Sequence, residues 1–286
     1  MKIKYLTKKA IVQFIDRALK EDIGDGDYST LSSIPEDLEQ KAQLLVKDHG
    51  ILAGVELTKW IFARVDQTVK VNTFFKDGQE IEHGDIVLSL EGNVRSILSA
   101  ERLVLNCMQR MSGIATYTNK MTELIKGTGV QLLDTRKTTP NFRICEKWAV
   151  KIGGGENHRF GLYDMIMLKD NHVDYAGGVR KAIQATLKYL EQNQLDLKIE
   201  VETRNLSEVE EVLEVGGIDV IMLDNMLPST MKEALKMIDK RYKTEASGGI
   251  SEKNIREIAE TGIDYISVGV LTHSYNSLDL SLKAIK

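Results

Sequence analysis

Positively charged side chains gather between residues 133 and 172 of this chain, at positions that follow strand-like segments. Five of them are candidates for binding an anion: Arg136, Lys137, His158, Arg159 and Lys169. Guanidinium groups pair with carboxylates and phosphates through two parallel hydrogen bonds, and a lysine adds a compact charge. The spacing therefore predicts a pocket for a polyanion. The alternative is a set of solvated charges in surface loops.

Two acidic residues end strand-like segments further along the chain. Glu202 closes the run KIEVE, and Asp224 closes the run VIMLD. A carboxylate at the end of a buried strand needs a partner, because an unpaired buried charge is costly. The two acids are candidates to bind ribose hydroxyls, to hold a metal ion beside a phosphate, or to stabilise positive charge on a sugar ring. The alternative is a structural ion pair with Lys169 or Arg136.

A glycine-rich segment follows the next strand-like run. The sequence EASGGI contains Ser247, Gly248 and Gly249, and Gly269 follows the strand after it. Glycines allow backbone N–H groups to approach a phosphate closely, and a helix that begins near Ser251 adds the positive end of its dipole. We interpret this segment as a phosphate cradle, whereas ordinary turn chemistry would account for an isolated Ser-Gly-Gly.

The elements that must position these residues alternate regularly after Gly129. Short apolar strands separated by helical segments are expected at residues 131–134, 165–168, 199–202, 220–223, 244–246 and 265–268. Such alternation predicts a parallel sheet, either doubly wound or closed into a barrel. Because the polar residues follow the strands, where a barrel places its active site, the pattern favours a barrel. No G-x-G-x-x-G sequence follows a strand, as a doubly wound dinucleotide site would require.

The chain before residue 97 has a mixed pattern of helices and strands. A helical pattern then runs from Ile97 to Ile125, carries Arg102, and is expected to be interrupted near Ser112 and Gly113.

The composition is that of a soluble globular protein, with 42% hydrophobic and 28% charged residues in 286. A net charge of -4 argues against sequence-independent binding of nucleic acid. The two cysteines argue against a disulfide framework and fit a reducing cytoplasm. We expect no signal peptide and no membrane span, because no apolar stretch is placed or long enough for either.

Ordered motifs along nearly the whole chain resemble one family. The runs DTRKTTP, GGGENHRFGLYD and KDNH, at residues 134–140, 153–164 and 169–172, are similar to those of the quinolinate phosphoribosyltransferases, or nicotinate-nucleotide pyrophosphorylases (carboxylating). The resemblance continues through EVE, LDNM, EASGGI and GVLTHS, and upstream through KEDIGDGDYST and SAERLVLNCMQRMSGIAT. A run such as EVE means little alone, but the ordered set is specific.

The resemblance implies an α/β fold in two parts. The expected parts are an N-terminal open α/β sandwich at residues 1–114, joined by the C-terminal tail 275–286, and an incomplete, seven-stranded TIM-like α/β barrel at residues 115–274. It also implies a homodimer, or a higher oligomer, in which the partner chain completes each active site.

The resemblance assigns roles to individual residues as well. Arg136, His158, Arg159 and Lys169 would bind the two carboxylates of quinolinate, and Arg102 would reach that site from the partner chain. Lys137, Glu202 and Asp224 would hold phosphoribosyl pyrophosphate and its Mg2+, with the two acids as metal ligands. Ser247, Gly248, Gly249 and Gly269 would cradle a phosphate. The expected catalytic residues are Lys137, Lys169, Glu202 and Asp224.

The implied reaction converts quinolinate and phosphoribosyl pyrophosphate to nicotinate mononucleotide, pyrophosphate and CO2, a step of NAD biosynthesis. Two alternatives stay open: a ModD-like phosphoribosyltransferase with another substrate, and a non-catalytic barrel that binds phosphate. The ModD-like branch tends to have Pro before His-Arg and no Tyr-Asp after Gly-Leu, so Asn157 and Tyr163-Asp164 favour the quinolinate branch. Asn141 and Val270 depart from residues common in the family, but neither changes a charge.

Overall fold

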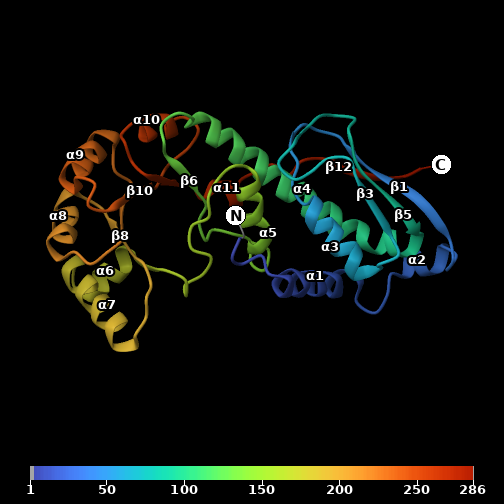
Figure 1. The fold of residues 1–286 in the computed structure, drawn as a ribbon, viewed down its shortest axis with the longest axis horizontal. Coiled ribbons are helices and arrows are strands. Elements are labelled where there is room, and N and C mark those ends of the chain that lie inside the picture. Colours follow the sequence, from blue (N-terminus) through green and yellow to red (C-terminus); the bar gives the residue numbers. More distant parts are fainter. Residues whose placement is uncertain (1–2, 286) are drawn as a thin grey trace. The chain divides into compact units, whose positions relative to one another are not determined.

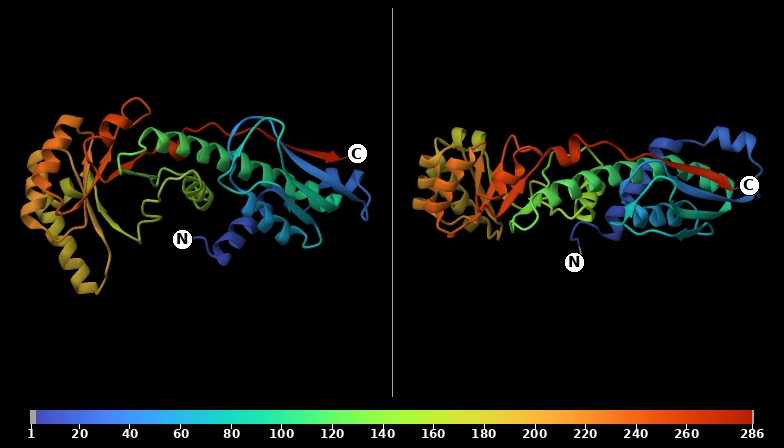
Figure 2. Two further views of the ribbon diagram at one scale, coloured as in Figure 1. Left: turned by 45° about the horizontal axis from the view of Figure 1, so that its top comes forward. Right: turned by 90° about the horizontal axis from the view of Figure 1, so that it is seen from above.

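An antiparallel sheet of four strands forms the centre of the first of two compact units in the computed structural model, which describes residues 3–285. Its strands lie in the order β12 (Leu280–Ile285), β1 (Glu39–Val46), β5 (Ile86–Asn93) and β3 (Lys70–Thr73). Alternate residues of β1 are buried, namely Ala42, Leu44 and Val46, as expected for a sheet with one face on the core. Figure 2 shows the red C-terminal strand β12 beside the blue strand β1, with which it pairs.

Helices cover this sheet and extend the first unit. They are α1 (Lys8–Ile23), α2 (Tyr28–Ser33), α3 (Val55–Val65), the first part of α4 (Val94–Leu124), α5 (Arg143–Ile152) and α11 (Val270–His273). A short pair, β2 (Gly50–Ile51) and β4 (Glu80–Ile81), completes the unit. The compact unit comprises residues 1–119, 137–154 and 270–286, so the expected boundary after residue 114 falls inside α4.

The predicted interruption near Ser112 and Gly113 is wrong, because α4 is continuous from Val94 to Leu124. A glycine is needed at position 113 for a different reason. A Cβ atom at Gly113 would collide with the carbonyl oxygen of Asn276, so the absent side chain lets the C-terminal segment cross the helix. A glycine in a helix therefore marks a close approach here and not a break.

Six parallel strands form the sheet of the second unit, residues 120–136 and 155–269. Their order is β6 (Gln131–Leu133), β11 (Tyr265–Ser267), β10 (Lys243–Ser247), β9 (Val220–Asp224), β8 (Ile199–Thr203) and β7 (Ile166–Leu168). A parallel bridge between Leu133 and Glu156 stands beside β6, in the place of a seventh strand. Every neighbouring pair is parallel, as the alternation of strands and helices predicts.

The connecting helices of this unit lie outside the strands, as Figure 1 shows for α8 and α9 against β8 and β10. They are α6 (Asp170–Ala176), α7 (Val179–Asn193), α8 (Leu206–Val215), α9 (Pro228–Ile238) and α10 (Ile255–Ala259). Their inner residues, such as Val209, Val212 and Ala234, are fully buried, whereas the strand ends carry the polar groups. No helix in residues 3–285 is long and apolar enough to cross a membrane.

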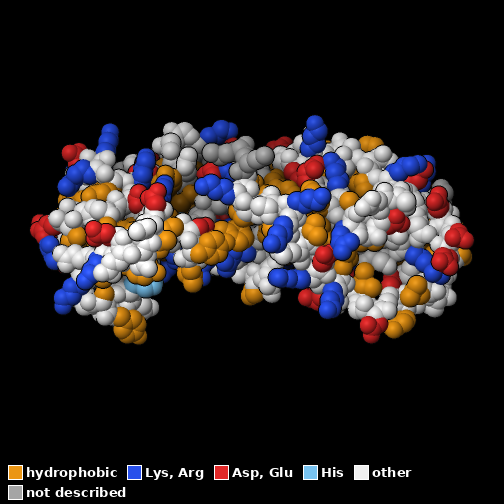
Figure 3. Space-filling view, turned by 60° about the horizontal axis from the view of Figure 1, so that its bottom comes forward, with side chains coloured by type: hydrophobic (Ala, Val, Ile, Leu, Met, Phe, Trp, Pro, Cys, Tyr) orange, Lys and Arg blue, Asp and Glu red, His pale blue; other side chains and the backbone are white. Residues whose placement is uncertain are grey.

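The face drawn in Figure 3 intermixes Lys and Arg with Asp and Glu side chains. A binding site for an anion therefore has to come from a local arrangement of residues, which the strand ends of the second unit supply.

Candidate active site

The register of the parallel strands places the acidic and hydroxyl side chains on one face of the sheet. Glu202 pairs with Met222, and Met222 pairs with Glu245. Residues in register, and residues two apart on a strand, face the same side. The shared face consequently carries Glu200, Glu202, Asp224, Glu245 and Ser247.

Lys169 and Glu202 meet at the end of this face. The Lys169 Nζ atom lies 3.2 Å from Glu202 Oε2, with the lysine side chain 45% exposed and the glutamate 9% exposed. The ion pair considered as an alternative therefore exists. It does not close the site, because the accessible lysine stabilises the charge of Glu202 and still offers N–H groups to a ligand.

Asp224 and the glycine segment are joined by Asn225, a residue that the sequence interpretation did not single out. The Asn225 side-chain amide donates to Asp224 at 2.6 Å, and its backbone N–H donates to the carbonyl oxygen of Ser247 at 2.8 Å. Gly248 has a φ of +87°, and a Cβ there would collide with the Asn225 amide. Asn225 therefore brings Asp224 next to the Ser247–Gly248 turn, and its amide leaves no room for a side chain at position 248.

Asp134 joins the two cationic motifs, and its side chain is fully buried. It accepts a hydrogen bond from the backbone N–H of His158 at 2.8 Å and another from the Asn157 amide at 2.6 Å. Its own N–H donates to the carbonyl oxygen of Glu156. Asp134 thus holds the segment that carries His158 and Arg159 against the end of β6.

Arg136 and Arg159 lie close enough to repel each other. Burial lowers the pKa of Arg159, and the positive charge of Arg136 lowers it further, while Glu200 and Asp164 act in the opposite direction. One Arg159 N–H group donates to the carbonyl oxygen of Met165 at 3.0 Å, which fixes the guanidinium. Two neighbouring guanidiniums form a site that a bound anion would stabilise.

His158 points into the interior of the second unit and meets two glutamates. Its Nε2 atom lies 2.9 Å from Glu200 Oε2 and 3.3 Å from Glu245 Oε2, and all three side chains are at most 7% exposed. Its Nδ1 atom accepts a hydrogen bond from the backbone N–H of Arg159 at 2.7 Å. We call His158, Glu200 and Glu245 the buried triad.

Burial and contacts determine how the buried triad is ionised. Burial lowers the pKa of His158, but hydrogen bonds to Glu200 and Glu245, with their negative charges, raise it to about 10. Burial raises the pKa of Glu200 to about 7 against the hydrogen bond from His158. These two pKa values indicate that His158 and Glu200 hold at least one proton between them at neutral pH.

Glu200 and Glu245 occur in the motifs EVE and EASGGI, yet the sequence interpretation gave neither a role. The period of a strand could have found Glu200, which shares a face with Glu202 two residues later. Nothing in the sequence shows that Glu245 and His158 reach the same point, since 86 residues and several turns separate them along the chain.

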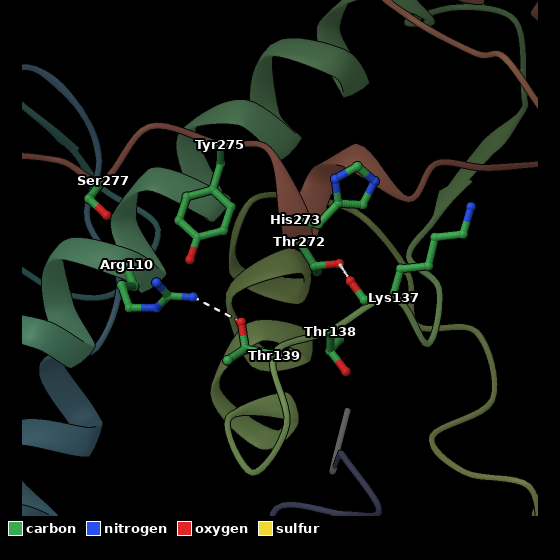
Figure 4. Close-up of a pocket in the computed structure, with 8 residues that line it drawn as sticks. All are labelled: Arg110, Lys137, Thr138, Thr139, Thr272, His273, Tyr275 and Ser277. Carbon is green, nitrogen blue, oxygen red and sulfur yellow. Dashed lines mark hydrogen bonds between the residues drawn. The ribbon is translucent and has the colours of Figure 1, made fainter.

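Lys137 lies in the first unit, where its carbonyl oxygen accepts a hydrogen bond from Thr272 Oγ1 at 2.9 Å. Lys137 also helps to line a cavity of about 320 Å3 within that unit. Arg110, His273 and Tyr275 line it too, with hydroxyl groups of Thr138, Thr139, Thr272 and Ser277 (Figure 4). Such a lining suits an anionic group. Arg102 is exposed on α4, also in the first unit.

Family models and known proteins match this chain along its length. The model described as quinolinate phosphoribosyl transferase, C-terminal domain, matches residues 114–283, and the N-terminal domain model matches residues 27–112. The chain belongs to the quinolinate phosphoribosyltransferase family.

Relatives and solved structures agree with this family. The chain is 47% identical to "Quinolinate phosphoribosyltransferase [decarboxylating] 2a, mitochondrial" of Nicotiana tabacum, over 93% of this chain and 80% of that protein. It is 40% identical to a "Probable nicotinate-nucleotide pyrophosphorylase [carboxylating]" of Bacillus subtilis, over 92% and 89%. The crystal structure of NadC from Streptococcus pyogenes has a TM-score of 0.90 at 40% identity, over 98% of this chain and 99% of that one.

Membership in the quinolinate phosphoribosyltransferase family confirms the predicted fold class and the predicted function, a pentosyltransferase of NAD biosynthesis. The division into domains and the roles of single residues stay predictions. The structure brings together Arg136, Arg159, Lys169, Glu202, Asp224, Ser247 and Gly248 at the strand ends of the second unit, and it places Lys137 and Arg102 in the first.

Proposed function

We propose that the strand ends of the second unit carry out the reaction of the family, from quinolinate and phosphoribosyl pyrophosphate to nicotinate mononucleotide, pyrophosphate and CO2. The observation that carries this proposal is the convergence of three features on one sheet end. These are the repelling guanidiniums of Arg136 and Arg159, the Lys169–Glu202 pair, and Asp224 joined to the Ser247–Gly248 turn. A simple phosphate binder has no need of all three.

The cationic part suits the dicarboxylate. Each guanidinium can hold one carboxylate through two hydrogen bonds, and Lys169 adds a mobile charge. Arg159 is half-buried and anchored to Met165, so its direction is set before a ligand arrives. Quinolinate, with two adjacent carboxylates, would relieve the repulsion between Arg136 and Arg159.

The acidic part suits the ribose and a magnesium ion bound with the pyrophosphate. Glu202 and Asp224 lie on the same face of neighbouring strands and offer carboxylate oxygens, which Mg2+ prefers. One oxygen of each is already engaged, Glu202 by Lys169 and Asp224 by Asn225. The donor set therefore fits an ion held by one or two carboxylates and by substrate phosphates, not an all-protein cage. Bound there, Mg2+ would neutralise charge on the leaving pyrophosphate.

The residues of the chain can support each step. The ring nitrogen of quinolinate attacks C1 of the ribose while the bond to pyrophosphate breaks, and positive charge develops on the sugar. Glu202 and Asp224 would stabilise that charge, and Lys137 would stabilise the departing pyrophosphate. The alkylated ring nitrogen is cationic, so it stabilises the electron pair left on the ring carbon when the carboxylate departs as CO2, and a proton from solvent then forms the C–H bond there. Ser247, Gly248, Gly249 and Gly269 would hold the ribose phosphate.

The assembly and the location belong to the same proposal. We infer a homodimer in which Arg102, exposed on α4, reaches the carboxylate site of the partner. A cytoplasmic location is supported by Cys107 and Cys145, which are free and buried, as thiols are in a reducing compartment.

A turnover assay tests the function. Purified protein, MgCl2 and phosphoribosyl pyrophosphate are incubated with carboxyl-labelled quinolinate or, in a parallel reaction, with nicotinate. We expect labelled CO2 and nicotinate mononucleotide from quinolinate, and no product from nicotinate. Product from nicotinate alone would indicate a different phosphoribosyltransferase, and binding without turnover would indicate a phosphate-binding barrel.

A further inference from the structure

The loop that begins at Lys137 is anchored at three successive residues, all by contacts within the first unit. The Lys137 carbonyl oxygen accepts a hydrogen bond from Thr272 Oγ1 at 2.9 Å, and Thr138 Oγ1 accepts one from Arg143 Nε at 2.9 Å. Thr139 is held twice, at its backbone N–H and at its hydroxyl. Because each residue of the loop has an anchor, the direction in which the Lys137 side chain leaves the backbone is set before a ligand binds.

Glu146 and Arg110 provide the two anchors at Thr139. Glu146 Oε2 accepts the Thr139 backbone N–H at 2.9 Å, and Arg110 Nη2 donates to Thr139 Oγ1 at 3.0 Å (Figure 4). The anchors are themselves paired, since the same Nη2 atom lies 3.2 Å from Glu146 Oε1. We call Arg110, Thr139 and Glu146 the loop clamp. Each member contacts the other two, so the loss of one disturbs both remaining contacts.

Burial and aromatic contacts make the loop clamp rigid. The Glu146 side chain is fully buried on α5, where leaving its charge unpaired would be costly. The Arg110 guanidinium lies over the rings of Phe142 and Tyr275, 5.2 and 5.4 Å from their centroids. Cations at such distances are attracted to aromatic faces. A guanidinium held by a buried carboxylate and two rings has little freedom to follow a ligand.

The loop clamp contributes geometry, whereas Lys137 contributes charge. Glu146 compensates the positive charge of Arg110, and Figure 4 shows the Lys137 side chain extending away from Arg110 and Thr139. On the basis of the function proposed above, we propose that Arg110 and Glu146 are positioning residues for Lys137. They hold Thr139, and so fix the loop that presents the Lys137 ammonium group to the pyrophosphate of phosphoribosyl pyrophosphate, without touching the substrate themselves.

A variant that removes the loop clamp and keeps stability separates positioning from folding. Arg110→Met combined with Glu146→Leu removes both charges together, so no buried charge is left unpaired. We expect a melting temperature close to that of the wild type and a KM for phosphoribosyl pyrophosphate that is roughly tenfold higher, about the effect of one hydrogen bond. KM for quinolinate should not change. A stable double variant with wild-type KM for both substrates would overturn the proposal.

A milder pair of variants tests the clamp if the double variant does not fold. Thr139→Val removes only the hydroxyl that Arg110 contacts, and Thr139→Ser keeps it. We expect Val to raise KM for phosphoribosyl pyrophosphate roughly threefold and Ser to restore it. Thr58→Val is the matched control, because it removes a buried hydroxyl that donates to the Gly54 carbonyl oxygen, and it should lower stability without changing KM. An unchanged KM in Thr139→Val would contradict the positioning role.

A double-mutant cycle tests whether the clamp acts through Lys137. The probe is inorganic pyrophosphate with MgCl2, and its Kd is measured by titration calorimetry, which needs no turnover. Removing the clamp should weaken binding roughly tenfold in the wild type but have little further effect in a Lys137→Met background, because coupled residues are not additive. An equal effect in both backgrounds would mean that Arg110 binds pyrophosphate itself, and would overturn the proposal. If the wild type does not turn over quinolinate, the proposed function fails, and the affinities for pyrophosphate still decide this inference.

Discussion

At the residue scale, Lys169 has two roles. It pairs with the buried Glu202, and its accessible ammonium group can also bind a ligand. We predict that Lys169→Met lowers kcat/KM for quinolinate at least 100-fold, about the loss expected for one charged group that stabilises a transition state. The melting temperature and kcat/KM would be compared with those of Lys232→Met, a change of an exposed lysine on α9. Wild-type kinetics in folded Lys169→Met would remove this residue from the site.

Arg110 has a structural task beside the cavity in the first unit. Glu146 is fully buried and accepts hydrogen bonds from the Arg110 guanidinium at 3.2 Å and from the Thr139 N–H at 2.9 Å. We predict that Arg110→Met lowers the free energy of unfolding in urea by about 3 kcal/mol, because it leaves a buried charge unpaired. The double variant Arg110→Met, Glu146→Leu should recover most of that loss. Equal stability of the single variant and the wild type would show that Glu146 needs no cation.

At the scale of elements, the turn after β10 requires glycine at position 248 because the backbone there has a positive φ and because Asn225 leaves no room for a Cβ atom. Gly248→Ala would introduce strain at a φ of +87° and a collision with Asn225, the residue that holds Asp224. We predict a higher KM for phosphoribosyl pyrophosphate together with a loss of about 1 kcal/mol or more of stability from the strain alone. Gly262→Ala is the matched control, since its φ is +95° with no atom within 4 Å of the added Cβ. A similar KM in both variants would argue against a phosphate cradle.

The strands and helices of the second unit were largely predictable from the sequence, but the contacts between elements far apart in the chain were not. The six parallel strands follow the alternation of short apolar runs and helices, and their polar ends mark the site. The continuity of α4 through Gly113 was missed, since the reason for that glycine is a contact with Asn276 far along the chain. The buried triad was missed for the same reason: it depends on strand register, which local patterns do not specify.

At the scale of the whole molecule, the second unit holds most of the candidate site, while Lys137 and Arg102 belong to the first. The family resemblance alone, and no contact among the described residues, assigns Arg102 to a partner chain. The arrangement has a measurable consequence, because a site shared between chains can be rebuilt from two inactive variants, whereas a site within one chain cannot.

We therefore predict that Arg102→Ala and Lys169→Ala are each inactive alone and recover activity when mixed. In the mixed dimer one site has the intact Lys169 of one chain and the intact Arg102 of the other. Equal amounts with random exchange should give about a quarter of the wild-type activity, since half of the dimers are mixed and each has one intact site. Asn106→Ala, one turn along the exposed side of α4, is the control and should keep full activity. If no mixing ratio, after unfolding and joint refolding, restores turnover, Arg102 does not act across a dimer interface.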